Sequence, residues 1–223
     1  MLGETRSSPV AHLTVREPRA IAPSGGARSE ASLRVWQRLK RTSLRRGRVG
    51  DDPEALSCDD ARVSVRIRSF VAGDADKIVA LSLRAWEPVF DSLRSVLGHR
   101  LFAELRGVDW RPGQAAAVRT TLEDATVQTW VAEIDGEVGG FVSAKHEPDD
   151  KMGEIVMVAV DPEYQRRGIA AELTEAAATW IAEQGASVIM VETGGDAGHT
   201  AARATYESAG FTALPVARYF RTV

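Results

Sequence analysis

One stretch constrains the fold of this chain more than any other. An apolar run, Val158–Val160, ends at Asp161-Pro162 and leads through a basic loop into a helix-forming segment that begins near Gly168. Proline ends a strand here because it fixes its own φ and donates no ladder hydrogen bond. The start of a helix carries unpaired N–H groups and about half a positive charge, so it binds phosphates well. The stretch therefore predicts a strand–loop–helix unit with an anion site.

The side chains of the loop support this interpretation. Gly168 has no Cβ, so an anion can reach the main chain, and the small Ala170 keeps the next turn open. Arg166 and Arg167 add positive charge at the same place. The alternative is an ordinary strand-to-helix turn with a solvated basic loop, because short motifs of this kind also arise by chance.

Two motifs together give the pattern more weight. Residues 165–170, Gln-Arg-Arg-Gly-Ile-Ala, match the Gln/Arg-x-x-Gly-x-Gly/Ala pyrophosphate loop of one enzyme family. Residues 202–211, Ala-Arg-Ala-Thr-Tyr-Glu-Ser-Ala-Gly-Phe, are similar to the closing Ala-x-x-x-Tyr-Glu-x-x-Gly-Phe signature of the same family, in the same order and at a similar spacing. From about Val63 to Val223 the chain therefore resembles the GCN5-related N-acetyltransferase (GNAT) superfamily.

The resemblance implies that acetyl-CoA is the co-substrate and suggests where it binds. Its pyrophosphate would lie on the loop and the helix start, and its pantetheine arm along the preceding strand. A splay between that strand and the next would free backbone N–H groups near Val158 to polarise the thioester carbonyl. The implied cofactor-binding residues are Val158, Ala159, Val160, Gln165, Arg166, Arg167, Gly168, Ile169, Ala170, Ala171 and His199.

Two residues are candidates for proton transfer. The resemblance places Tyr206 near the sulfur of CoA, where a phenol is a suitable general acid for a departing thiolate; the alternative is an aromatic ring packed beneath the cofactor. Glu154 resembles a catalytic glutamate carried by the same strand in several family members. Desolvation beside apolar strand residues would raise its pKa and suit it to accept a proton, directly or through water. The alternative is a solvated glutamate at the edge of the strand.

His199 departs from the family pattern, which commonly has asparagine seven residues before the tyrosine. An imidazole can donate and accept hydrogen bonds as an amide does, but it also titrates near neutrality. It either replaces the structural asparagine at a helix start, which we favour because a helix N-terminus disfavours the protonated ring, or joins the proton relay.

Composition limits the kinds of partner and cofactor that we expect for the protein. The net charge is −3, with the first 60 residues net basic and the rest net acidic. The single cysteine, Cys58, excludes an intrachain disulfide, and His12, His99 and His146 lack metal-ligand spacing, so we expect no metal. No apolar run approaches the length of a membrane span and no signal peptide is visible, which predicts a cytoplasmic protein without a membrane partner.

The chain divides into two predicted parts: a flexible extension over residues 1–61, rich in Arg, Pro, Gly and Ser, and a GNAT domain over residues 62–223. Residues 32–46 form a basic run that could be a short helix. A solvated tail, without nucleic acid as a partner, is the simpler interpretation of this run; binding to nucleic acid or an anionic membrane surface is the other. A homodimer stays an open alternative.

The domain is predicted to be an α/β fold, a mixed and mostly antiparallel sheet flanked by helices, as in GNAT acyltransferases. Asp135-Gly136 predicts a hairpin turn, Gly185 a helix end, and Pro88 a kink or break. Strands are expected at 63–68, 129–134, 138–145, 154–160, 187–192 (buried) and 211–220, and helices from about 74, at 92–105, 113–123, 169–184 and 199–209.

These expectations converge on an N-acetyltransferase that moves an acetyl group from acetyl-CoA to a primary amine of a small molecule or peptide, by direct attack in a ternary complex. A non-catalytic acyl-CoA sensor, and an acetyltransferase acting on a protein N-terminus or lysine, are the alternatives. Candidates to line the acceptor cleft are Trp86, Glu87, Phe90, Trp110 and the acidic residues 147–150, whose charge would favour a cationic amine.

Overall fold

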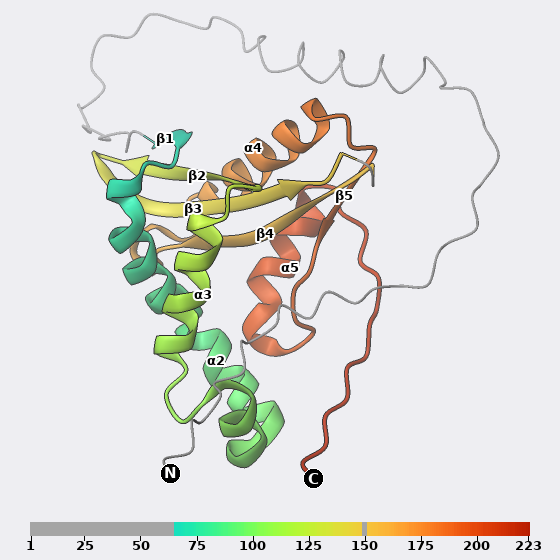
Figure 1. Ribbon diagram of the computed structural model, residues 1–223. Coiled ribbons are helices and arrows are strands. Elements are labelled where there is room, and N and C mark those ends of the chain that lie inside the picture. The colour runs from blue at the N-terminus through green and yellow to red at the C-terminus, as the bar shows by residue number, and fades with distance from the viewer. Residues whose placement is uncertain (1–64, 149–150) are drawn as a thin grey trace, which may run out of the picture. The chain divides into compact units, whose positions relative to one another are not determined.

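The sheet of this protein has five strands. The computed structural model describes residues 65–148 and 151–223, and in these ranges the strand order is β1-β2-β3-β4-β5 (Figure 1). The first three pairings are antiparallel and the last, between β4 and β5, is parallel. This confirms the mixed, mostly antiparallel sheet that the sequence predicts. The strands are β1 (Val65–Ser69), β2 (Val127–Ile134), β3 (Glu137–His146), β4 (Met152–Val160) and β5 (Val188–Val191).

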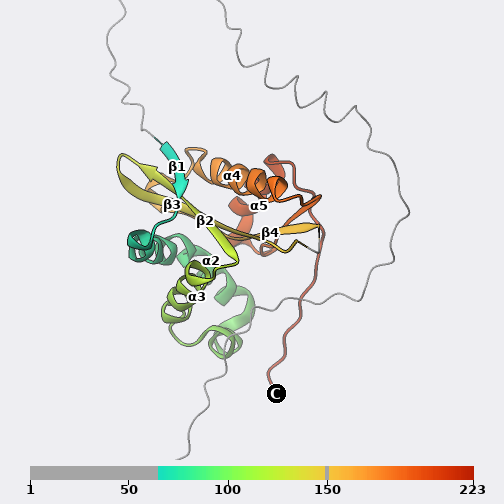
Figure 2. The ribbon, with the colours of Figure 1, turned by 45° about the horizontal axis from the view of Figure 1, so that its top comes forward.

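Helices cover both faces of the sheet. α2 and α3 lie on one face and α4 on the other, while α5 lies beside the β4–β5 end (Figures 1 and 2). α4 connects the parallel strands β4 and β5, so the predicted β-α-β unit is present. The helices are α2 (Ala75–Arg106), α3 (Arg111–Glu123), α4 (Ile169–Glu183) and α5 (Thr200–Ser208), with short 3₁₀ turns η1 (Ala72–Asp74), η2 (Pro162–Tyr164) and η3 (Ala197–His199).

Side-chain alternation along the strands builds a core on each face. Successive strand residues point to opposite faces. On β3, Phe141 packs towards α2 and α3 while its neighbour Val142 packs towards α4, and on β4 the pair Ala159 and Val160 divides in the same way. The half of β4 that precedes the anion loop is therefore held from both sides.

The two glycine signals in the sequence are confirmed. Asp135 and Gly136 both have positive φ, 51° and 88°. A two-residue turn with this conformation matches the right-handed twist of the strands that it joins. Gly185, directly after the C-cap of α4, has φ 94°.

Three predictions about elements were wrong. α2 (Ala75–Arg106) runs through Pro88 and departs from helical φ and ψ at Gly98 instead (φ 74°, ψ 158°), so the predicted break at Pro88 is absent. β5 is half-buried to exposed, because it forms an edge of the sheet. The expected strand at 211–220 is absent from the described residues: Pro215 cannot donate to a ladder, and the apolar side chains of Leu214, Val216 and Tyr219 are exposed.

Some predictions lie outside the described residues. These are the extension over residues 1–61 with Cys58 and the basic run, the first two residues of the strand predicted at 63–68, and the acidic residues Asp149 and Asp150.

Candidate active site

The site begins where β4 leaves β5. The parallel pairing runs only from Met152 opposite Val188 to Ile155 opposite Val191. On its other side β4 stays paired with β3 as far as Val160, with an irregularity at Val156 that bends the strand. The edge of β4 after Ile155 is thus free of a neighbouring strand in the described structure, and its backbone groups are available to a ligand. This is the splay that the sequence predicts next to Val158.

The loop after β4 presents backbone N–H groups at the start of α4. Arg166 (φ 65°) and Gly168 (φ 83°) both take left-handed conformations, which bend the chain sharply before the helix. Within residues 65–148 and 151–223, the N–H groups of residues 166–170 have no acceptor. The N–H of Ala171 differs, since it donates to the Gly168 carbonyl at 3.0 Å. A Cβ built on Gly168 would meet no atom within 4 Å, so the space there is open.

Side chains fix the loop from behind. The Gln165 amide donates to the Val160 carbonyl at 3.0 Å, so this residue holds the loop to the end of β4. The buried carboxylate of Asp161 accepts from the Glu163 N–H and binds the guanidinium of Arg84, which comes from α2. No local pattern predicts the Arg84–Asp161 pair, because the two residues are 77 positions apart.

The two loop arginines behave differently. Arg167 donates to the Glu163 carbonyl at 3.2 Å and its guanidinium lies 5.6 Å from the centre of the Tyr164 ring. Arg166 is exposed and has no ion-pair partner among the described residues. The loop therefore keeps one cationic side chain that a bound anion can recruit.

Tyr206 lies on α5 in apolar surroundings. Its ring packs edge-to-face against Phe211 at 5.9 Å, and the Tyr206 carbonyl accepts from the Phe211 N–H at 3.0 Å. Burial raises the pKa of Tyr206 to about 12. The phenol is thus protonated at neutral pH, which is the form that a proton donor needs.

Glu154 has surroundings that the sequence did not suggest. Its carboxylate forms an ion pair with Lys145 of β3 at 2.9 Å, and about a quarter of its side chain is exposed. The residue stands opposite Met190 in the paired part of β4, four positions before Val158, or about 13 Å along an extended strand. The structure therefore does not bring Glu154 to the open end of β4, and its environment is not purely apolar.

His199 belongs to a hydrogen-bonded cluster that links three elements. Its Nδ1 lies 2.5 Å from Oδ1 of Asp196, and the other oxygen of that carboxylate accepts from the Ser92 hydroxyl of α2 at 2.5 Å. The ring makes no capping hydrogen bond to α5, although His199 is the N-cap residue. Ser92 and Asp196 were not among the predicted site residues. The Asp-x-x-His spacing is a local signal for Asp196, but nothing local marks Ser92.

Two of the residues expected to line the acceptor cleft, Phe90 and Trp110, are buried in the core. Phe90 and Trp110 stack at 4.0 Å between ring centres and are buried, and the Trp86 ring packs on Phe141 at 6.2 Å. Glu87 forms a salt bridge with Arg111 at 2.5 Å. These aromatic side chains stabilise the packing of α2 on α3 and the sheet instead.

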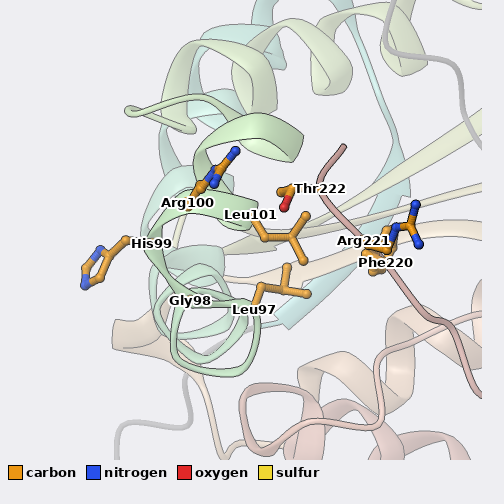
Figure 3. Close-up of a pocket in the computed structure, with 8 residues that line it drawn as sticks. All are labelled: Leu97, Gly98, His99, Arg100, Leu101, Phe220, Arg221 and Thr222. Atoms are coloured by element: carbon orange, nitrogen blue, oxygen red, sulfur yellow. The ribbon is translucent and has the colours of Figure 1, made fainter.

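A separate pocket of about 490 Å³ lies between the break in α2 and the C-terminal segment. Figure 3 shows Leu97 and Leu101 turned towards Phe220 and Thr222, while His99 points away. No residue of the loop at 165–171 lines it. Among the described residues no group of three or more His, Cys, Asp or Glu side chains could hold a metal ion, and no helix is long and apolar enough to cross a membrane.

Comparison with known families agrees with this geometry. The model of the acetyltransferase (GNAT) family matches residues 94–211, which is more than half of the chain and includes both the loop and Tyr206. The chain belongs to this family. The match ends at Phe211, where the last regular element of the described structure has also ended.

Individual family members cover different parts of the chain. A mycothiol acetyltransferase of Amycolatopsis mediterranei is 32% identical over 180 residues, 73% of this chain and 50% of its own. One from Clavibacter sepedonicus is 28% identical over 95% of this chain and 62% of its own. The chain thus spans less than two thirds of the length of these relatives.

Solved structures of the family share the fold. An N-acetyltransferase of Thermoplasma acidophilum in complex with coenzyme A superposes with a TM-score of 0.52 at 14% identity, over 69% of this chain and 93% of that one. An aminoglycoside N-acetyltransferase in complex with CoA gives 0.50 at 17% identity, over 72% and 95%.

Proposed function

We propose that this chain transfers an acetyl group from acetyl-CoA to a primary amine by direct attack in a ternary complex. The observation that carries the proposal is the row of N–H groups without acceptors at residues 166–170, directly beside the open edge of β4. A pyrophosphate needs several converging donors, and a pantetheine arm needs an unpaired strand edge. Family membership and the names of the relatives support the same reaction.

The residues that would hold the co-substrate follow from this geometry. The pyrophosphate would bind the N–H groups of residues 166–170, with the side chain of Arg166 added to them. Gln165 and Arg167 would contribute by holding the loop, since both side chains are bonded to backbone carbonyls. The free edge of Val158, Ala159 and Val160 would bind the pantetheine arm. The open space at Gly168 fits a close approach of phosphate to the main chain.

The chemistry requires one proton donor and one proton acceptor. Acetyl-CoA supplies the acetyl group as a thioester: a carbon–nitrogen bond forms, the carbon–sulfur bond breaks, and the sulfur leaves as a thiolate. Tyr206 would protonate that thiolate, because its phenol carries a proton at neutral pH. Glu154 would accept the amine proton only through water, since it is paired with Lys145 and lies upstream of the open edge.

A panel of amines tests the proposal. The relatives are named for mycothiol, a thiol, and the structural neighbour for aminoglycosides. The panel therefore comprises a thiol-bearing amine, L-cysteine amide, and an aminoglycoside, kanamycin, with spermidine added as a linear polyamine. CoA release is measured by chromatography, because thiol reagents also react with L-cysteine amide, and CoA affinity by calorimetry. Acetyl transfer to at least one amine supports the proposal. Tight CoA binding without transfer to any amine would favour the acyl-CoA sensor, and absence of CoA binding would overturn both.

A further inference from the structure

The cluster of Ser92, Asp196 and His199 is built more tightly than helix capping requires. Each oxygen of the Asp196 carboxylate binds a different side chain at 2.5 Å: Oδ1 the imidazole and Oδ2 the Ser92 hydroxyl. The Gly198 N–H also donates to both Ser92 Oγ (2.9 Å) and Asp196 Oδ2 (3.1 Å). The cluster therefore clamps η3 onto α2.

The backbone packs closely around the imidazole ring of His199. A Cβ on Gly194 would lie 2.4 Å from Nδ1 of His199 and 2.5 Å from Oδ1 of Asp196. A Cβ on Gly198 would lie 2.7 Å from the Cβ of Ser92. Two glycines thus create the space in which the imidazole and the carboxylate meet, and the ring is held in one orientation.

The clamp leaves one nitrogen of the imidazole available. Hydrogen bonds from Ser92 and His199 outweigh burial and lower the pKa of Asp196, so the carboxylate is ionised at neutral pH. An ionised carboxylate accepts, which places the proton of a neutral ring on Nδ1 and leaves Nε2 as an acceptor. Nε2 of His199 has no hydrogen-bond partner among the described residues. It is also not fully buried, because His146 Nε2 is the one fully buried side-chain nitrogen or oxygen without a partner in the described structure.

The position of the ring relates it to the proposed proton donor. His199 is the N-cap of α5 and stands before its first turn (φ −97°, ψ 6°), eight residues after Val191, where the pairing of β5 with β4 ends. Tyr206 lies seven residues further along, on α5 itself. The chain segment that follows the separation of β5 from β4 therefore carries both the imidazole and the phenol.

We propose that Nε2 of His199 accepts the proton of the attacking amine, with Asp196 and Ser92 as positioning residues. The proposal rests on the proposed acetyltransferase function. The amine binds as an ammonium, and one of its protons passes to Nε2 before the nitrogen attacks the thioester carbonyl, so the ring becomes an imidazolium and later releases this proton to solvent. Asp196 stabilises the cation, as a carboxylate does in other base–carboxylate pairs. After attack the carbon–sulfur bond breaks, Tyr206 gives its proton to the departing sulfur, and the second proton of the nitrogen restores the phenol.

Other charged groups near the ring are few. Arg203 of α5 donates to the carbonyls of Gly194 and Asp196 and to the Thr200 hydroxyl. On the α2 side, the residues that face Gly198 are Ser92 and, through its backbone, Val89, and neither of them titrates. The neighbouring Asp91 is paired with Arg94. Asp196 is therefore the one carboxylate bonded to the imidazole in the described structure.

His199→Asn is the decisive variant, because its side-chain amide keeps a donor to Asp196 in place of Nδ1–H but has no basic nitrogen. We expect kcat/KM with the best acceptor of the panel to fall about 10²-fold or more at pH 7. The acidic limb of the pH profile should move to higher pH, because the variant depends on the free amine losing its own proton, and the defect should shrink to less than about tenfold near pH 10, where the amine arrives unprotonated. CoA affinity and melting temperature should stay close to those of the wild type.

Two further variants separate a chemical from a structural role. Asp196→Asn should put the proton on the wrong ring nitrogen and lower the rate about as much as His199→Asn, with no further loss in the double variant. Glu154→Gln tests the competing proton acceptor: a change in the acidic limb in this variant, with no change in His199→Asn, would assign the amine proton to Glu154 and overturn the inference. Acetyl-CoA hydrolysis without an amine gives a second readout, because water needs the same proton acceptor.

The outcomes distinguish this inference from the function on which it rests. If the wild type transfers acetyl groups and His199→Asn keeps its rate within about threefold and its acidic limb, the inference is wrong and the function stands. If His199→Asn is equally slow at every pH, the ring has only a structural role. If the wild type binds CoA but neither transfers nor hydrolyses, the function fails and the inference fails with it.

Discussion

Two glycines at opposite ends of α4 allow the anion site to be tested against a matched control. Gly168 precedes the helix with φ 83°, and Gly185 follows it with φ 94°. An added Cβ would meet no atom within 4 Å at either position. Alanine at each site therefore introduces the same backbone strain without a clash, but only Gly168 belongs to the proposed pyrophosphate loop.

The expected magnitudes follow from this symmetry. A left-handed conformation costs a residue with a Cβ roughly 1–2 kcal/mol, and the loss of glycine entropy in the unfolded chain offsets about 0.4–1 kcal/mol of it. Both variants should therefore lose about 1 kcal/mol of stability, or about 2–4 °C in melting temperature for a domain of this size. A lost charge-assisted hydrogen bond to phosphate costs about 1.5–3 kcal/mol, so Gly168→Ala should weaken CoA binding at least about tenfold.

Calorimetric titration with CoA and thermal unfolding of both variants give the comparison. Gly185→Ala should bind CoA within about twofold of the wild type, although it melts as early as Gly168→Ala. Equal CoA affinity in the two variants would refute the assignment of the loop at residues 166–170 as the pyrophosphate site. Unequal melting temperatures would refute the claim that strain acts alone at both positions.

The remaining predictions concern the proton donor, an ion pair and the packing of the core. Tyr206→Phe should lower kcat about 10²-fold in steady-state assays with little change in CoA affinity, and a normal kcat would exclude the phenol as the acid. Hydrogen bonds from Arg68 lower the pKa of Asp74 below its ordinary value of 3.8, so their stabilisation is complete above that pH and is lost as the pH falls through the folded-state value. Asp74→Asn should therefore cost roughly 2 kcal/mol at pH 7 by urea unfolding and progressively less towards pH 2; a constant difference would contradict the assignment. A Cβ on Gly153 would lie 2.2 Å from Cγ2 of Ile181, so Gly153→Ala should cost about 1–3 kcal/mol, and clearly less when Ile181→Ala is also present; strict additivity of the two would show that they do not clash.

Local signals in the sequence predicted most of the sheet. Apolar stretches marked β2, β3 and β4 within two residues of their ends, and the Asp135-Gly136 turn predicted the antiparallel pairing of β2 with β3. Gly168 and Gly185 marked both ends of α4. These features depend on the conformational preferences of a few adjacent residues, which act in the same way in any fold.

Other predictions failed because they depended on distant residues. The segment 211–220 has the apolar content of a strand but finds no partner among the described residues, and a strand without a ladder does not persist. Pro88 was expected to interrupt the helix, yet the interruption occurs at Gly98, whose backbone adopts a conformation that other residues avoid. Trp110 was a candidate for the acceptor cleft, but it stacks in the core on Phe90, for which a core position was the more frequent alternative.

The sequence by itself determined the family resemblance, the anion loop and Tyr206, because each is encoded in a short run of residues whose backbone and side chains act together. Only the tertiary structure decided which side chains contact the candidate site residues. It paired Glu154 with Lys145 and joined His199 and Asp196 to Ser92, a residue more than a hundred positions away. Hydrogen bonds and ion pairs act over a few ångströms in space, so partners that are distant in the chain become visible only when the fold brings them together.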